Sequence, residues 1–147
     1  MDILFDRHLE YLSDVPTEFT RGLMNVIDWD SMLVMIRGPK GVGKSTLMQQ
    51  YVLKNYLPTD RHILYCSADT AYFSNHTLLD TASEFVKMGG KVLLIDEIHK
   101  YENWSREIKE IYDLYKGLKV ILSGSSLIQL NDGQADLSRR ADVYDMP

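Results

Sequence analysis

The sequence predicts an α/β fold in which the strands of a parallel sheet alternate with helices. Residues 32–36 and 92–95 are uninterrupted apolar runs, which are typical of strands buried on both faces of a sheet. After the first run, apolar side chains recur at helical spacing over residues 47–52. This alternation favours parallel pairing, because a helix carries the chain back to the start of the next strand. The 147 residues are enough for one domain with a sizeable core.

Composition and charge exclude several classes of protein. With 45% hydrophobic and 25% charged residues the chain is typical of soluble globular proteins, and no apolar run approaches the length of a membrane span. The first residues lack the features of a signal peptide, so we expect a cytoplasmic protein without membrane contact. The net charge of −5 predicts no direct nucleic-acid binding by this domain. The single cysteine, Cys66, allows no internal disulfide and is expected in the core.

Two helices are expected before the first strand, at residues 2–12 and 17–27. The inward residues expected of the second helix are Phe19, Leu23, Met24 and Ile27. Such leading helices either cover an edge of the sheet or approach the base of a nucleotide, and the sequence leaves both roles open.

Residues 38–46 follow the first apolar run and predict a phosphate-binding loop (P-loop). Gly38 is followed by four residues and then by Gly43-Lys44-Ser45. In such a loop backbone N–H groups surround phosphates, the lysine reaches the β- and γ-phosphates, and the hydroxyl coordinates magnesium. A plain glycine-rich turn is disfavoured because a strand precedes the loop and a helix follows it. The predicted nucleotide-binding residues are Gly38, Pro39, Lys40, Gly41, Val42, Gly43, Lys44, Ser45 and Thr46.

A further strand and helix are expected between the P-loop helix and the second apolar run. Residues 62–66 suit a strand, and residues 78–86 carry apolar side chains at helical spacing. Gly89-Gly90 then ends the expected helix.

Asp96 and Glu97 follow the second apolar run, at the end of a strand where open α/β sheets bind ligands. An acidic pair after a strand is weak evidence alone, but the preceding P-loop makes it a Walker B pattern. We therefore expect Asp96 and Ser45 to hold Mg²⁺. Glu97 is expected to align, or accept a proton from, the water that attacks the γ-phosphate.

An amphipathic helix is expected at residues 103–116. Near its start, His99, Tyr101 and Trp104 are interpreted as core or helix-capping residues rather than as a surface for stacking bases. His99 has no second histidine or cysteine at the spacing of a metal site.

The next strand, residues 118–122, ends in a polar tip. Ser125 or Ser126 is expected to contact the γ-phosphate or the attacking water, or to cap a helix that starts near Leu127. Arg139 and Arg140 precede an apparent fifth strand and are either an arginine finger or a solvated surface pair.

These motifs together resemble the AAA+ ATPase superfamily. The finer pattern resembles a predicted family of bacterial and archaeal AAA-type ATPases whose members continue into a C-terminal domain, sometimes compared with nucleases. The residues that carry this finer resemblance are Asp96-Glu97-Ile98-His99-Lys100-Tyr101 with Trp104, then Gly124-Ser125-Ser126, then Leu137-Ser138-Arg139-Arg140-Ala141.

The resemblance implies a three-layer P-loop NTPase fold, with helices on both faces of a five-stranded parallel sheet of order 5-1-4-3-2. It also implies that Arg139 or Arg140 acts in trans, on the neighbouring subunit of a homo-oligomer. Residues 1–147 are expected to form the ATPase core, with N-terminal helices at 1–30 and the nucleotide-binding sheet at 31–147. A helical lid and the C-terminal domain are expected to be absent from this chain.

The sequence therefore predicts Mg²⁺-dependent binding and hydrolysis of ATP, with ADP as product. This reaction is expected to drive a conformational change in an unknown protein partner or a C-terminal effector domain. The candidate catalytic residues are Lys44, Glu97, Ser125, Ser126, Arg139 and Arg140. Two alternatives stay open, a nucleotide-dependent switch with little turnover and a P-loop kinase.

Overall fold

A computed structural model describes residues 1–130 and 137–147, and its strands form a five-stranded sheet. The strands are β1 (Leu33–Arg37), β2 (Ile63–Ser67), β3 (Val92–Asp96), β4 (Lys119–Gly124) and β5 (Asp142–Asp145). Their order is β2-β3-β4-β1-β5, and every neighbouring pair is parallel. Read from the other edge, this is the predicted order 5-1-4-3-2, which is confirmed.

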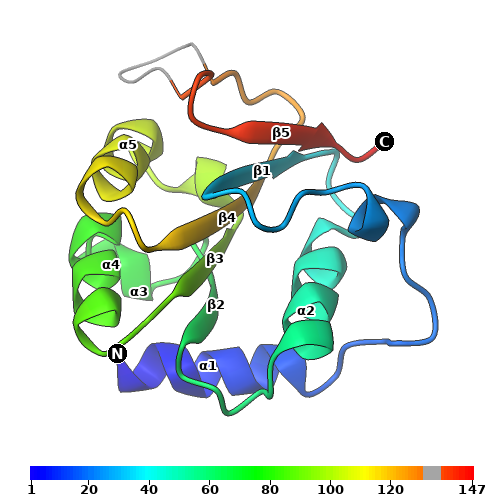
Figure 1. Cartoon of the computed structure of the whole chain (residues 1–147), viewed down its shortest axis with the longest axis horizontal. Coiled ribbons are helices and arrows are strands. Elements are labelled where there is room, and N and C mark those ends of the chain that lie inside the picture. Colours follow the sequence, from blue (N-terminus) through cyan, green and yellow to red (C-terminus); the bar gives the residue numbers. More distant parts are fainter. Residues whose placement is uncertain (131–136) are drawn as a thin grey trace.

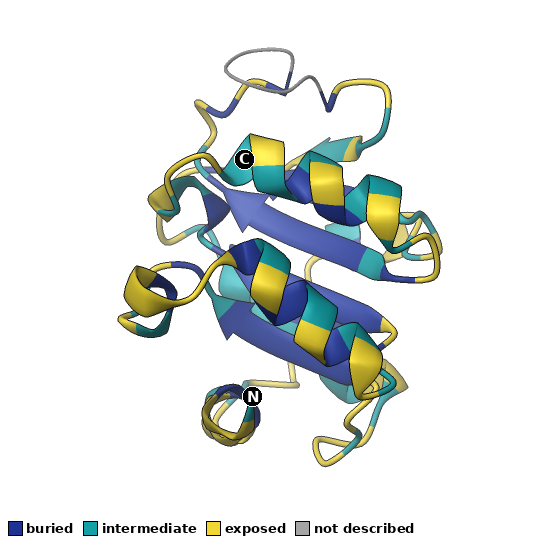
Figure 2. Ribbon diagram, turned by 90° about the vertical axis from the view of Figure 1, so that its left-hand side faces the viewer, coloured by how far each residue is buried: buried dark blue, intermediate teal, exposed yellow. Residues whose placement is uncertain are grey.

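Helices cover both faces of the sheet (Figure 1). Helix α2 (Lys44–Asn55) lies on one face, and α3 (Tyr72–Asn75), α4 (Leu78–Lys87) and α5 (Trp104–Leu114) lie on the other. Successive residues of β1 serve opposite faces, since Leu33 and Met35 belong to one buried apolar cluster and Val34 and Ile36 to the other. In Figure 2 strands β1–β4 are almost wholly buried, whereas β5 at the edge has only intermediate and exposed residues, and the exposed residues of α4 and α5 face outward. This is the predicted three-layer arrangement.

Helix α1 (Asp2–Leu12) covers the edge of the sheet at β2. In this helix His8 is only 1% exposed, and its Nδ1 accepts a hydrogen bond from the backbone N–H of Tyr65 at 2.9 Å. Because Nδ1 accepts, the neutral ring carries its hydrogen on Nε2, which donates to the carbonyl of Pro58 at 3.2 Å. The helix therefore provides a hydrogen-bond acceptor for a backbone N–H of the edge strand β2 that would otherwise be unpaired. Of the two roles left open for the leading segments, α1 has the first.

The predicted helix at residues 17–27 is wrong. The structure has only the short 3₁₀ helix η1 (Gly22–Asn25), and Phe19, expected inward, is 70% exposed. Met24 and Ile27 are buried as expected. The amide of Gln50 in α2 donates to the carbonyls of Pro16 and Phe19, each at 2.7 Å, and so occupies groups that a helix would use itself. Glycine at position 22 further disfavours a helix.

Apart from the helix expected near Leu127, the other helix and strand predictions agree with the structure to within a few residues. Helix α4 ends where expected, with Gly89 at a φ of 94° and the Gly90 N–H bonded to the carbonyl of Phe85 at 2.8 Å. Cys66 is buried in the core, and burial raises the pKa of its thiol to about 12. No helix in the described ranges has the length and apolar character needed to cross a membrane.

The contact between α1 and β2 is expected to make stability depend on pH. Burial lowers the pKa of His8 below its ordinary value of 6.5. The unfolded chain therefore binds the proton at higher pH than the folded chain does. The contribution of His8 to the free energy of unfolding is therefore fully present above about pH 6.5. It decreases as the pH falls from there toward the lower pKa that His8 has in the folded protein.

Urea denaturation at a series of pH values between about 5 and 8 measures this effect. His8→Asn is expected to remove part of the pH dependence, whereas His76→Gln, a change at an exposed histidine, is expected to keep it. An unchanged pH dependence in His8→Asn would contradict the assignment.

Candidate functional site

The loop between β1 and α2 has a backbone that only glycine accommodates at several points. Gly41 and Gly43 have φ values of 82° and 104°, in the left-handed region. A Cβ on Gly38 would lie 2.5 Å from the carbonyl oxygen of Met146, which follows β5. The loop therefore turns sharply, passes against the end of β5 and leads into the N-terminus of α2, where unpaired backbone N–H groups favour an anion.

Lys44 is folded into this loop. Its side chain is only 6% exposed, and Nζ donates to the carbonyls of Gly38 at 2.7 Å and Pro39 at 3.0 Å. The ammonium group thus lies inside the turn that the sequence predicts to bind phosphates.

Asp96, the last residue of β3, is 3% exposed, and its carboxylate accepts hydrogen bonds from three hydroxyl groups. Ser45 at the start of α2 and Tyr65 of β2 donate to Oδ2, and Ser123 of β4 donates to Oδ1. The two predicted magnesium ligands, Ser45 and Asp96, are therefore in direct contact. Burial and the neighbouring Asp96 carboxylate raise the pKa of Tyr65 far above its ordinary value, so its hydroxyl stays a donor.

Sequence reasoning missed Tyr65 and Ser123. A signal for Tyr65 was present, because a tyrosine in the middle of a buried strand needs a partner for its hydroxyl. Ser123 lies within the polar strand tip, but the sequence singled out only the two serines after Gly124.

Glu97 has a φ of 56°, which is uncommon for a residue other than glycine. Its backbone N–H donates to Ser123 Oγ at 3.0 Å and to Asp96 Oδ1 at 3.1 Å. Its carboxylate Oε2 lies 3.4 Å from Nε2 of His99, and its side chain is 31% exposed. Glu97 also lines a cavity beside the loop.

This cavity of about 590 Å³ brings together seven of the fifteen predicted site residues; of the predicted loop, Gly41, Val42, Gly43, Ser45 and Thr46 are not in its wall. Its wall comprises Gly38, Pro39, Lys40, Lys44, Asp69, Glu97, His99, Lys100, Ser125, Ser126 and Leu127. Ser45 and Asp96 are outside this wall but each follows or precedes a wall residue in the chain, Lys44 and Glu97, and they are hydrogen-bonded to each other. Sequence reasoning did not anticipate Asp69, Lys100 or Leu127 in this wall, and its interpretation of His99 as a core or helix-capping residue is wrong, because His99 lines the cavity too.

The helix expected to start near Leu127 is wrong, because residues 126–127 form a turn. Ser125 Oγ accepts the N–H of Leu127 at 3.1 Å, and the Ser125 carbonyl accepts the N–H of Ile128 at 3.1 Å. Ser125 thus stabilises a turn and does not cap a helix. Ser126 is exposed at the cavity wall.

Neither predicted arginine lies in the cavity wall. Arg140 is half-buried against α5, where Nε lies 3.4 Å from the Asp113 carboxylate and the guanidinium lies 6.0 Å from the Tyr112 ring. Arg139 is exposed. The two residues that the sequence could not separate therefore have different surroundings.

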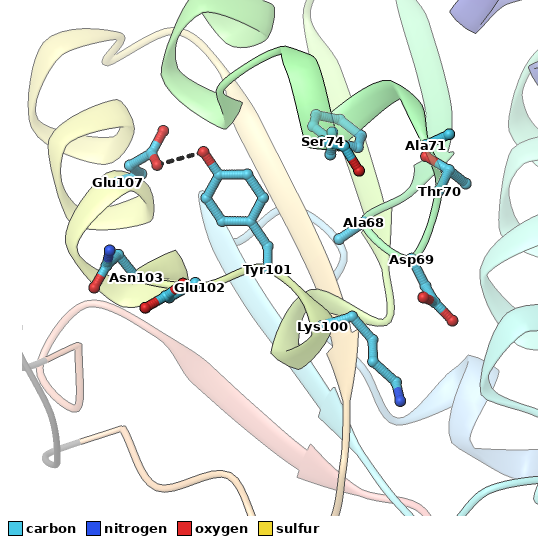
Figure 3. A pocket seen from close by; sticks show the side chains of 11 residues that line it. Ala68, Asp69, Thr70, Ala71, Ser74, Lys100, Tyr101, Glu102, Asn103 and Glu107 are labelled. Atoms are coloured by element: carbon cyan, nitrogen blue, oxygen red, sulfur yellow. Dashed lines mark hydrogen bonds between the residues drawn. The ribbon is translucent and has the colours of Figure 1, made fainter.

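A second cavity, of about 570 Å³, adjoins the first and shares Asp69 and Lys100 with it (Figure 3). On its far wall the Tyr101 hydroxyl donates to Glu107 Oε2 at 2.6 Å, and Glu107 Oε1 accepts the N–H of Leu79 at 3.0 Å. Burial raises the pKa of Tyr101 to about 12. The Tyr101 hydroxyl also accepts the N–H of Leu78 at 3.4 Å, so Tyr101 links α4 and α5, in agreement with its interpretation as a structural residue.

Comparison with known proteins gives one family match. A family model described as an AAA domain matches residues 30–147. Comparison with curated proteins found no match.

Two solved structures share the fold. PCH-2 from C. elegans is 16% identical, with a TM-score of 0.53 over 99% of this chain and 40% of that chain. AMPPCP-bound DnaA from Aquifex aeolicus is 23% identical, with a TM-score of 0.52 over 97% of this chain and 44% of that chain. The chain thus spans less than half the length of either protein.

The hydroxyl contacts of Asp96 generate a prediction for stability. Tyr65→Phe keeps the ring but removes a donor to a buried carboxylate, so the free energy of unfolding is expected to fall by about 1–3 kcal/mol. Chemical denaturation at neutral pH measures this change.

Tyr11→Phe is the matched control. The Tyr11 ring packs edge-on against Tyr65 at 5.2 Å between centroids, and its hydroxyl has no hydrogen-bond partner among the described residues. This variant is expected to change stability by less than about 0.5 kcal/mol. Equal losses in the two variants would contradict the importance of the Tyr65–Asp96 contact.

Proposed function

This chain belongs to the AAA domain family, and we propose that it binds ATP with Mg²⁺ and hydrolyses the bond between the β- and γ-phosphates. One observation carries the proposal. Lys44 and Glu97 line the same cavity, while Ser45 and Asp96, their neighbours in the chain, are hydrogen-bonded to each other. A phosphate-binding cation, a water-activating carboxylate and two oxygen ligands for a metal are thus within reach of one ligand.

The phosphates are proposed to bind in the turn of residues 38–43, at the N-terminus of α2. Lys44 now donates to the carbonyls of Gly38 and Pro39. Exchange of these neutral acceptors for phosphate oxygens would give stronger, charge-assisted hydrogen bonds. Lys40 lines the same cavity and adds a second positive charge.

Ser45 and Asp96 are the residues that would hold Mg²⁺. Their oxygen atoms suit a hard cation, which commonly uses one or two protein ligands together with substrate phosphates and water. Among the described residues, no cluster of three or more His, Cys, Asp or Glu side chains could hold a metal without such help. When bound, Mg²⁺ supplies positive charge that neutralises phosphate oxygens.

Glu97 is proposed to align the attacking water and to accept its proton. Glu97 lines the same cavity as Lys44. The hydroxyls of Ser125 and Ser126, in the same wall, are proposed to contact the γ-phosphate or this water.

An apolar recess of about 270 Å³ beside the loop is proposed to receive the base. It lies between η1 and the end of β5, and it is lined by Arg21, Gly22, Leu23, Val26, Asp145, Met146 and Pro147. Arg21 connects the recess to the loop, because its Nη2 donates to the carbonyl of Val42 at 2.8 Å. On this proposal the segment at residues 21–26 has the second of the two roles left open for the leading segments.

Arg139 is proposed to act in trans on the cavity of a neighbouring subunit. It is exposed, whereas Arg140 is held by Asp113 and Tyr112 on its own chain. Since neither lines the cavity of its own chain, a head-to-tail contact between copies would be needed, and such contacts can close into rings. The work done by ATP is proposed to occur in a lid, C-terminal domain or partner outside residues 1–147.

Two variants separate binding from turnover. Lys44→Ala is expected to raise the Kd for ATP by about 100-fold, because charge-assisted phosphate contacts are lost. Glu97→Gln is expected to keep the Kd within about threefold but lower kcat by on the order of 100-fold, because only the transition state needs the base. Calorimetric titration and phosphate release from the full-length protein measure the two quantities.

Lys54→Ala, in the last turn of α2, is the control and should match wild type. Equal turnover by Glu97→Gln and wild type would refute the role of Glu97. Tight ATP binding without phosphate release by wild type would instead favour the nucleotide-dependent switch.

Mixing experiments test the arginine in trans. Arg139→Ala retains Glu97, and Glu97→Gln retains Arg139, so a mixture of the two inactive variants is expected to release phosphate faster than either alone. Arg106→Ala, at an exposed arginine of α5, should behave as wild type without mixing. A mixture no faster than the average of its components would contradict action in trans.

A further inference from the structure

We propose that His99 is a positioning residue that couples the Glu97 carboxylate to the backbone of Ser125 at the tip of β4. The inference rests on the proposed role of Glu97 in hydrolysis. It adds a connection between the residue that acts on water and the residue expected to detect the γ-phosphate.

The position of His99 follows from the chain directly after Glu97. A 3₁₀ turn, η2 (Ile98–Lys100), begins there, and its first residue Ile98 is fully buried. The buried isoleucine anchors the turn, and His99 lies against the tip of β4. The ring lies close to Gly124, since a Cβ at that position would contact His99 Nδ1 at 3.4 Å; the same Cβ would clash with Ile128 Cδ1 at 2.3 Å.

The hydrogen bond at one ring nitrogen determines what the other can do. Nδ1 of His99 accepts the backbone N–H of Ser125 at 3.2 Å. In the neutral ring the hydrogen is then on Nε2. Nε2 lies 3.4 Å from Oε2 of Glu97, so the ring presents a donor to this carboxylate. Contacts of this kind in ligand-free sites are often long and shorten when the substrate binds.

Glu97 is thus connected to β4 twice, by different parts of the residue. Ser123 holds its backbone N–H, whereas His99 is the polar partner of its carboxylate within residues 1–130 and 137–147. The first contact maintains the left-handed backbone. The second selects the direction of a side chain that is otherwise partly open to solvent.

The coupling has a consequence for control of the reaction. Ser125 contributes its N–H to His99 and lines the cavity next to Lys44. A shift of the strand tip when the γ-phosphate position is filled would therefore move the ring and the carboxylate together. Glu97 would reach its working position only in the presence of a nucleoside triphosphate.

His99→Phe tests the proposal in the full-length protein, because phenylalanine keeps a ring but neither nitrogen. We expect kcat to fall by about 10- to 100-fold, the range typical of groups that orient a ligand or base, while KM and the Kd for ATP stay within about twofold. His99→Gln, whose amide can still donate toward Glu97, should recover part of kcat. In the Glu97→Gln background, His99→Phe should cause no further loss, because the group through which it acts is gone.

His76→Phe, at an exposed histidine outside both cavities, is the control and should keep wild-type kcat. Wild-type kcat in His99→Phe would overturn the inference and leave the proposed function intact, as would an independent, additive loss in the Glu97→Gln background. Absence of phosphate release by wild type would overturn the proposed function and this inference with it.

Nitrogen NMR of the imidazole gives a readout that does not depend on a variant. In its neutral form the His99 ring of the wild-type protein should carry its hydrogen on Nε2. A hydrogen on Nδ1 would exclude the hydrogen bond from Ser125 and overturn the inference.

Discussion

The buried carboxylate of Asp96 is the constraint on which the site depends. A carboxylate removed from water is costly unless hydrogen bonds compensate, and Asp96 obtains them from Ser45, Tyr65 and Ser123. These donors belong to α2, β2 and β4. Satisfying one charge therefore fixes the start of α2 against the carboxyl ends of the strands, and with it the loop that precedes α2.

The edges of the sheet contribute to the same geometry. At one edge α1 pairs with β2 through His8, and β2 supplies Tyr65 to Asp96. At the other edge the N–H of Met146 bonds the carbonyl of Arg37 at 2.7 Å, and its own carbonyl lies where a Cβ on residue 38 would clash. The loop between β1 and α2 is thus shaped by contacts at both edges and not only by its glycines.

Local sequence patterns predicted the helices and strands well wherever the burial of apolar side chains alone determines them. Apolar runs predicted β1 and β3, and helical spacing predicted α4 and α5, because both depend on the chain's own periodicity. The same reasoning failed at residues 17–27, where the apolar spacing was real but Gln50 takes two carbonyls and Phe19 faces solvent. A distant side chain outweighed a weak local preference there.

The sequence by itself determined the α/β class, the loop at residues 38–46 and the acidic pair Asp96-Glu97, since glycine spacing and strand ends are local features. Only the tertiary structure decided that Tyr65 donates a hydrogen bond to Asp96, that His99 contacts both Glu97 and Ser125, and that Arg140 packs against α5. These contacts join side chains from separate elements. Their partners depend on the directions in which packed helices and strands point, which spacing along the chain does not encode.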